Sequence, residues 1–324
     1  MSLLHFDSFN YYPSTDYLSY LYTQGATPAT LSLDGRDSTY CLNIGTNESI
    51  FYSFTANTDI TVGFAINIAD VTSIAKLICS FRDSALGVQV QAYKQANTGV
   101  IELYLNNTWK AESTLALESS TWYFIEFSVH IANSGGTFTC YVDGEEWTSY
   151  TGDTQYRTSN TVNQIGLAYS GCFIDDLYVA SGLTMLGDCS IAKTLPISNG
   201  SVIEWDASAG SNYQTIDEDT QDGDTSYNST STNSEKDSFD FQDTPSNINI
   251  YGIRVLLFAR KDDVDAHVIR PFVIIGGITY YGDNISVADA YDYYEYIWEN
   301  SPSSSSAWTE AEVNSAQFGY ERVS

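Results

Sequence analysis

Positive charge is scarce in this chain. Its 324 residues contain 13 Lys and Arg against 41 Asp and Glu, for a net charge of −28. Nucleic acids and anionic lipid surfaces are polyanions that their binding proteins neutralise with cations. The charge balance therefore excludes a nucleic-acid-binding or membrane-surface protein, and we expect neither partner.

Long apolar runs and closely spaced cysteines are also missing. No stretch reaches the roughly 18 apolar residues that cross a membrane, and no basic segment precedes an apolar one near the first residue, so we expect no signal peptide. The 5 cysteines form no C-x-x-C pair, which disfavours a zinc site or a disulfide framework. We interpret them mostly as buried apolar side chains, and Cys172 and Cys189 would bridge only if their geometry allowed it. The cysteines are Cys41, Cys79, Cys140, Cys172 and Cys189.

Tyrosine and alternating apolar residues are abundant instead. The chain has 25 Tyr and only 6 Pro, and apolar residues occupy every second position in residues 60–68, 101–105, 123–131 and 138–142, and in 173–179 except at Asp175. Such alternation predicts β-strands with two distinct faces. Turn pairs such as Asp143-Gly144 separate the runs. Many short antiparallel strands predict a sandwich or jelly roll.

The pattern changes after about residue 184. Residues 204–243 hold eleven acidic residues and one lysine, which indicates a long looping region or polar edge strands. Residues 250–258 and 268–275 are almost continuously apolar and predict central strands, whereas the aromatic run 291–298 fits a core or a subunit interface. Thr309 and Glu312 fit a capping box that opens one short helix. We predict two β-rich domains, residues 1–184 and 185–324.

Three segments of the first half carry a family resemblance. They are Thr121–Phe127, Phe138–Gly144 and Gly171–Val179. Their order and spacing resemble the laminin-G/concanavalin A-like jelly roll, which the resemblance implies for roughly residues 1–182. The predicted fold is therefore all-β, with this jelly roll followed by a second β-sandwich-like domain that has one short helix.

The whole chain resembles a narrower family, the tailed-bacteriophage virion structural proteins that pair a laminin-G-like domain with a second β domain. The matching segments are Met1–Phe9, Leu186–Asp188, Ile216–Glu218, Asp222–Tyr227, Lys236–Phe239, Ala259–Asp263 and Trp308–Asn314. The resemblance implies a non-enzymatic component exposed on the virion, made in the host cytoplasm and assembled with other virion proteins as a homo-oligomer. It leaves open a tail-associated or a capsid-decorating position. The alternative is an adhesin that binds host-surface glycans.

No catalytic motif stands out. Glycosidases of the concanavalin A-like fold place two carboxylates on an E-x-D-x-x-E strand. The nearest match here, Glu235 to Asp240, ends in Asp and lies in the polar region of the second domain. We therefore expect no enzymatic activity.

Two sets of residues are candidate binding sites. Trp109, Trp147 and Tyr150 lie near turns and can stack on sugar rings, although ordinary packing at the rim of the sandwich also explains them. The acidic run can bind calcium through four aspartates, although an EF-hand register fails and a solvated loop explains it too. These aspartates are Asp217, Asp219, Asp222 and Asp224. Asp175 and Asp176 are a further calcium candidate, or a turn at a strand end.

Overall fold

The chain forms two compact units. The structure, a computed structural model, describes residues 2–45, 48–168 and 171–324, and divides the chain into Met1–Ile191 (unit 1) and Ala192–Ser324 (unit 2). The sequence prediction places the boundary after residue 184. The segment after that residue stays with unit 1 because the backbone N–H groups of Leu186 and Ile191 donate to Glu126 and Asp176.

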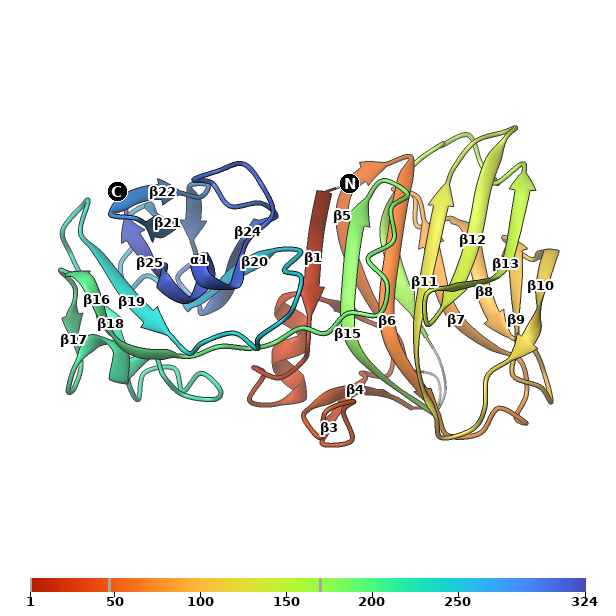
Figure 1. Ribbon diagram of the computed structural model, residues 1–324, viewed down its shortest axis with the longest axis horizontal. Helices are drawn as coiled ribbons and strands as arrows, with labels where there is room; N and C mark the ends of the chain where they lie inside the picture. Colours follow the sequence, from red (N-terminus) through yellow and green to blue (C-terminus); the bar gives the residue numbers. More distant parts are fainter. Residues whose placement is uncertain (1, 46–47, 169–170) are drawn as a thin grey trace. The chain divides into compact units, whose positions relative to one another are not determined.

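Unit 1 is a sandwich of two antiparallel sheets (Figure 1). One sheet has the order β13-β12-β11-β6-β15-β4-β3, with β1 also pairing with β15; the other has the order β10-β9-β8-β7-β14-β5-β2. The strands of the first sheet are β1 (Ser2–Asp7), β3 (Thr30–Ser32), β4 (Cys41–Ile44), β6 (Asp59–Ile68), β11 (Trp122–His130), β12 (Gly136–Val142), β13 (Glu145–Gly152) and β15 (Cys172–Ser181). Those of the second are β2 (Thr23–Gln24), β5 (Ile50–Asn57), β7 (Lys76–Arg82), β8 (Val88–Lys94), β9 (Val100–Leu105), β10 (Thr108–Ala116) and β14 (Val162–Leu167).

Alternating apolar side chains build the core between these sheets. Val62 and Phe64 on β6 and Phe127 on β11 are fully buried, and Phe81 from one sheet meets Phe138 from the other with ring centroids 5.9 Å apart. A strand that places every second side chain on one face buries that face as a unit. All five alternating segments of the first half are strands, as predicted.

The Asp143-Gly144 pair makes the expected hairpin between β12 and β13. Both residues have positive φ, 50° and 80°, and Val142 pairs with Glu145 across them. Two successive positive φ values match the right-handed twist of the paired strands, and glycine adopts the second without steric cost.

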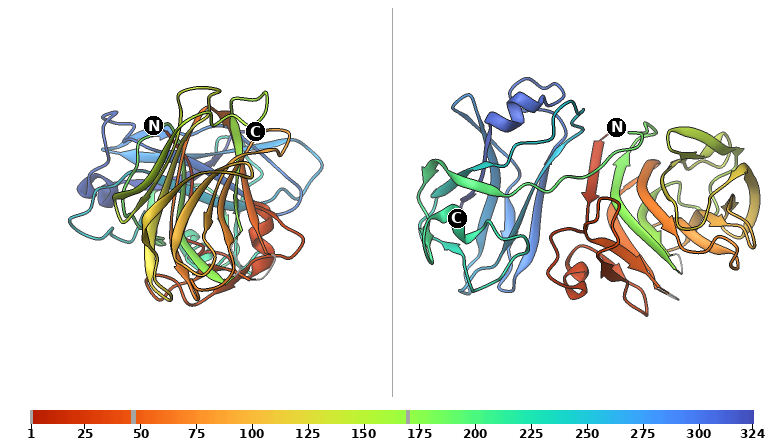
Figure 2. Two further views of the ribbon diagram at one scale, coloured as in Figure 1. Left: turned by 90° about the vertical axis from the view of Figure 1, so that its right-hand side faces the viewer. Right: turned by 60° about the horizontal axis from the view of Figure 1, so that its bottom comes forward.

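Unit 2 is also antiparallel (Figure 2). Its six-stranded sheet has the order β16-β19-β25-β21-β22, with β23 also pairing with β21, while β20 pairs with β24 in a separate sheet. Val273 and Phe318 of the larger sheet share a core with Trp298 of the smaller one. The strands are β16 (Pro196–Ile203), β17 (Asp206–Ala207), β18 (Asn228–Ser229), β19 (Lys236–Phe241), β20 (Ile253–Ala259), β21 (His267–Ile275), β22 (Ile278–Tyr281), β23 (Ile285–Val287), β24 (Asp292–Trp298) and β25 (Gln317–Arg322).

Two predictions for unit 2 are corrected. Strand β21 is central, as predicted, but β20 pairs with β24 alone among the described strands. Residues 236–241 of the acidic region, expected in a loop or an edge strand, form β19 between β16 and β25. The buried Asp237 is tolerated there because its carboxylate accepts hydrogen bonds from the backbone N–H groups of Glu204 and Trp205 and from the Asn212 amide.

The predicted short helix is α1 (Glu310–Ser315). Thr309 caps it by accepting from the backbone N–H of Glu312 at 3.2 Å, whereas the Glu312 carboxylate accepts from the hydroxyl groups of Ser301 and Ser303. The all-β class with one short α-helix is confirmed for the described residues. Among all the described residues, no helix is long and apolar enough to cross a membrane.

Candidate functional site

The three aromatic residues predicted to bind glycans lie on two neighbouring edge strands of unit 1. Trp109 is on β10, and Trp147 and Tyr150 are on β13. These strands end the two different sheets and contact each other. The structure therefore brings the three residues to one edge of the sandwich.

Trp147 and Tyr150 pack into that edge. Trp147 occupies a β-bulge and meets Tyr123 edge to face, with centroids 6.2 Å apart. The Lys110 ammonium lies 5.2 Å from the centroid of the Tyr150 ring. Both aromatic residues are half-buried, so their surroundings fit the packing interpretation.

Trp109 has a different environment. Its side chain is 51% exposed and it pairs with Tyr104 on β9, next to a bulge at Lys110. Directly paired residues in antiparallel strands present their side chains on the same face. Tyr104 pairs onward with Gln91 of β8, whose neighbours Val90 and Ala92 point into the core. Trp109 and Tyr104 therefore lie on the outer face of the seven-stranded sheet.

One line of paired positions crosses this outer face from β10 to β5, and we call it the aromatic row. Aromatic residues occupy both ends, and the small or amide-bearing residues of the middle are buried. Five steps of about 4.8 Å between strands make the row roughly 24 Å long. Its members, in order, are Trp109, Tyr104, Gln91, Ser80, Gly166 and Phe51.

Gly166 allows the ring of Phe51, at the β5 end of the row, to pack against the backbone of the sheet. A Cβ atom on Gly166 would be 2.6 Å from Cε1 of Phe51, so the Phe51 ring packs directly on the glycine backbone. The Arg82 guanidinium lies 4.4 Å from the centroid of that ring. Phe51 is thus fixed between the sheet and a cation, and the residue as a whole is half-buried.

Polar groups flank the end of the aromatic row that holds Trp109 and Tyr104. Tyr93 meets Tyr104 edge to face at 5.2 Å, and the Tyr104 hydroxyl donates to Glu102 at 3.1 Å. Burial, with the Glu102 hydrogen bond and charge, raises the pKa of Tyr104, so this phenol stays protonated. Gln95 bridges Glu102 and Glu112 at 3.0 and 3.2 Å. Exposed ring faces beside fixed carboxylates and amides can stack on sugar rings and bond their hydroxyls.

Sequence reasoning found Trp109 but missed Tyr104, Tyr93 and Phe51. Tyr104 belongs to the alternating run 101–105, whereas Tyr93 and Phe51 lie on β8 and β5, outside the five runs named above. The register that places them beside Trp109 comes from cross-strand pairing. An aromatic residue on the polar face of a predicted strand is the signal that could have marked them.

The four aspartates predicted to bind calcium lie in one segment of unit 2, and three of them have hydrogen-bond or ion-pair partners. Asp219 pairs with Lys193 at 2.5 Å and Asp224 with Arg260 at 3.0 Å, while Asp222 accepts from the Ser226 hydroxyl at 2.9 Å and Asp217 is exposed. Across residues 2–45, 48–168 and 171–324, no three His, Cys, Asp or Glu side chains group as metal ligands. Calcium binding stays a prediction.

Asp175 and Asp176 hold a different element in place. Asp176 has a positive φ of 50° at an irregularity of β15, and its carboxylate accepts the Ile191 N–H at 2.7 Å. Arg36 lies 3.7 Å from Asp176 and pairs with Asp188 at 2.6 Å. Burial, reinforced by Asp176, raises the pKa of Asp175 to about 7, and burial raises that of Asp176 to about 6. Asp176 and Arg36 thus fasten residues 188–191 to β15, whereas the Asp175 carboxylate accepts the backbone N–H of Arg36 at 3.0 Å.

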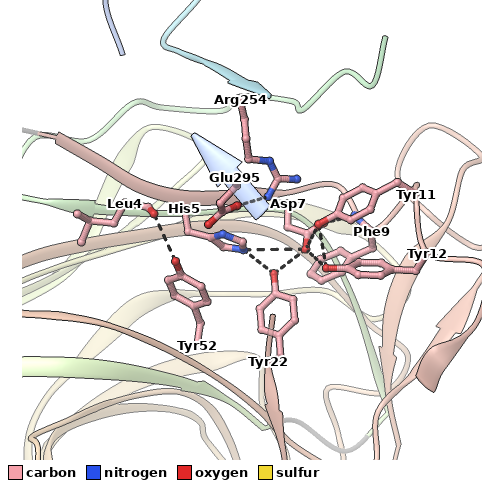
Figure 3. A network of polar contacts seen from close by, with 10 residues as sticks. All are labelled: Leu4, His5, Asp7, Phe9, Tyr11, Tyr12, Tyr22, Tyr52, Arg254 and Glu295. Carbon is pink, nitrogen blue, oxygen red and sulfur yellow. Dashed lines mark hydrogen bonds and ion pairs between the residues drawn. The ribbon is translucent and has the colours of Figure 1, made fainter. Parts of the chain in front are cut away.

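A second polar cluster surrounds Asp7 (Figure 3). Its Oδ2 atom accepts from the hydroxyl groups of Tyr11, Tyr12 and Tyr22 at 2.9, 2.6 and 2.7 Å, and the Tyr22 hydroxyl also lies 2.8 Å from the Nε2 atom of His5. Burial, together with the Asp7 charge, raises the pKa of Tyr12 well above its ordinary value. The cluster ties β1 to the segment that follows it, which is a structural role.

The carboxylates of the glycosidase-like segment are also engaged in hydrogen bonds. Glu235 accepts from the Thr230 hydroxyl, and Asp240 accepts from Ser198 and Gln317 at 2.8 and 3.0 Å. Asp237 between them is fully buried. The segment holds the sheet of unit 2 together.

Several solved structures are similar to part of the chain. A sialidase shares 13% identity over 56% of this chain and 18% of its own, with a TM-score of 0.44. Domain 4 of an extracellular arabinanase from Geobacillus stearothermophilus, solved with arabinotriose, shares 15% sequence identity. The match covers 57% of this chain and 94% of that domain, with a TM-score of 0.40. A carbohydrate-binding module from Bacillus subtilis shares 11% sequence identity over 49% of this chain and 95% of the module, with a TM-score of 0.35.

The chain thus spans less than a fifth of the sialidase. The similar structures are carbohydrate-binding and glycosidase-like β-sandwich domains, and nothing in these comparisons links the chain to a bacteriophage virion. No protein-family model matches the chain, and no curated protein does.

Proposed function

We propose that unit 1 binds glycan chains without cleaving them, through the aromatic row on the outer face of its seven-stranded sheet. The observation that carries this proposal is the line from the exposed Trp109 through Tyr104 to Phe51. Its accessible residues, Trp109 and Tyr104 at one end and Phe51 at the other, are separated by buried residues. A ligand that contacts both ends must span roughly 24 Å, which requires an oligosaccharide. Tryptophan, tyrosine and arginine are also the residues that contribute most to binding surfaces.

A glycan array probed with the full chain tests this proposal. We compare the unmodified chain with Trp109→Ala and with Leu115→Ala, a matched control because Leu115 is 55% exposed on the same strand. Truncating an anchoring aromatic residue should weaken binding about tenfold, or about 1.4 kcal/mol. Equal signals from the two variants, or no bound glycan at all, would refute the aromatic row as a binding site.

Binding without hydrolysis is the second half of the proposal. It is supported by the glycosidase-like segment, whose carboxylates hold strand β19 through hydrogen bonds. The full chain incubated with an oligosaccharide from the array should release no new reducing ends. If new reducing ends still appear when the Trp109→Ala variant is incubated at a high oligosaccharide concentration, the protein is a glycosidase.

A second proposal is that the protein is a virion component, either tail-associated or capsid-decorating. It would assemble with other virion proteins as a homo-oligomer. It is supported by the order of the matching sequence segments from Met1–Phe9 to Trp308–Asn314. Peptides of this chain should then occur in purified phage particles at a fixed ratio to the major capsid protein. Their absence from washed particles would remove this proposal and leave glycan binding untouched.

A further inference from the structure

Unit 1 also contains a hollow of about 380 Å³ at one end of its eight-stranded sheet. Its floor comes from two directly paired residues, Asn67 on β6 and Phe173 on β15. Its wall comes from the loop after β3, with Leu33, Asp34 and Ser38, and from Ser120 ahead of β11. The residues that line the hollow thus carry an aromatic ring, an amide, a carboxylate and two hydroxyl groups, beside the apolar Leu33 and Ala69.

The rim of the hollow is held in an uncommon backbone conformation. Ser38 and Ser120 have φ values of 62° and 56°, a region that side chains other than glycine, asparagine and aspartate rarely adopt. The Ser120 N–H donates to the Ile68 carbonyl at 2.7 Å, and the Ser38 N–H donates to that of Gly35 at 3.1 Å. A Cβ atom on Gly35 would lie 2.5 Å from the Thr39 carbonyl oxygen. Strain held by surrounding bonds often marks a ligand site.

We propose that this hollow binds one neutral sugar residue at the end of a glycan. The Phe173 ring offers a face for the apolar side of a sugar ring, and Asp34 and Asn67 offer a strong acceptor and a mixed donor and acceptor for its hydroxyls. A pocket of this size fits a small ligand rather than a chain.

The charge of the lining defines the ligand class further. Of the described residues that line the hollow, none is Lys, Arg or His, and Asp34 brings a negative charge. A carboxylate or phosphate on the ligand would meet repulsion without a compensating cation. Uronic acids, sialic acids and sugar phosphates are therefore excluded.

This site is independent of the proposed aromatic row. The row crosses the seven-stranded sheet, whereas Asn67 and Phe173 belong to the eight-stranded sheet. Substitutions at one site should leave the other unchanged, so the two proposals fail separately.

Saturation-transfer NMR on the full chain tests the hollow with glucose, galactose, mannose, N-acetylgalactosamine, glucuronic acid and sialic acid. Asp34→Asn is compared with Asp37→Asn, which removes the same charge from the same loop at an exposed residue outside the lining. A hydrogen bond to a carboxylate contributes enough that its loss should weaken affinity roughly tenfold.

We expect at least one neutral sugar to bind, Asp34→Asn to weaken it, and Asp37→Asn to leave it unchanged. A binding difference that is equal for Asp34→Asn and Asp37→Asn would overturn the proposal. Preference for the acidic sugars, or no binding by any neutral sugar, would overturn it as well.

Discussion

Tyr178 reaches across Gly63 to donate a hydrogen bond of 2.5 Å to Glu126. Gly63 pairs with Glu126 on one side and with Tyr178 on the other. The same Oε1 atom of Glu126 accepts from the backbone N–H groups of Leu186 and Gly187 at 2.9 and 3.0 Å. A buried carboxylate is thus satisfied by three donors, and residues 183–191 stay on the sheet.

The missing side chain of Gly63 makes this contact possible. A Cβ atom there would lie 2.1 Å from Cε1 of Tyr178, so Gly63→Ala should lower the free energy of unfolding by about 1–3 kcal/mol. Chemical denaturation of the full chain measures this change. In a Tyr178→Ala background the same substitution should cost much less, because the clashing ring is gone. Additive effects of the two substitutions would contradict the contact.

The protonation of Asp175 should make the stability of the protein depend on pH. Its pKa is raised to about 7 by burial and by Asp176, against about 3.9 in an unfolded chain. The folded state then binds the proton more tightly, so this stabilisation is complete below about pH 4 and is lost as the pH rises through about 7.

Melting temperatures from pH 4 to 8 measure that loss. Asp175→Asn should reduce the decline with rising pH relative to the unmodified chain. Asp16→Asn removes a charge from an exposed residue and should leave the decline as it is. Parallel curves for all three proteins would contradict the assignment to Asp175.

The cysteines should behave as five buried or half-buried thiols. All five are free, four of them are fully buried, and Cys189 is half-buried. Burial raises the pKa of Cys41 and of Cys189 to about 12, which disfavours the reactive thiolate. A thiol reagent should therefore react slowly with the native chain and with all five thiols after unfolding without reductant. Three thiols in the unfolded chain would indicate a disulfide, and Cys172 with Cys189 would be its first candidates.

Alternation of apolar residues predicted the strands of unit 1 well because each buries one face. It said less about the opposite face. Glu126 alternates with core residues of β11 and is only 1% exposed, because an irregular segment about 60 residues later covers it. Such a contact has no period along the sequence.

Positions of strands within a sheet were harder to predict than the strands themselves. Both β20 and β21 are rich in apolar residues, but β21 lies inside a sheet and β20 pairs with one neighbour. The acidic β19 lies inside a sheet because donors from other segments surround Asp237. Composition reports burial, whereas the order of strands depends on distant partners.

The candidate site follows the same rule. The exposed Trp109 was identified from its residue type and its polar neighbours. Tyr104 and Phe51 join it only through five successive strand pairings. A binding surface that crosses a sheet is assembled from single residues of many strands, so no local motif encodes it.

The measurement that tests the aromatic row most directly is an indole NMR titration of the full chain. The chain has 6 Trp, and the Trp109→Ala variant assigns the Trp109 signal. With the oligosaccharide that binds best on the array, the Trp109 indole N–H signal should shift, and those of the buried Trp298 and Trp308 should stay in place. A bound oligosaccharide that leaves the Trp109 signal unmoved would contradict the account.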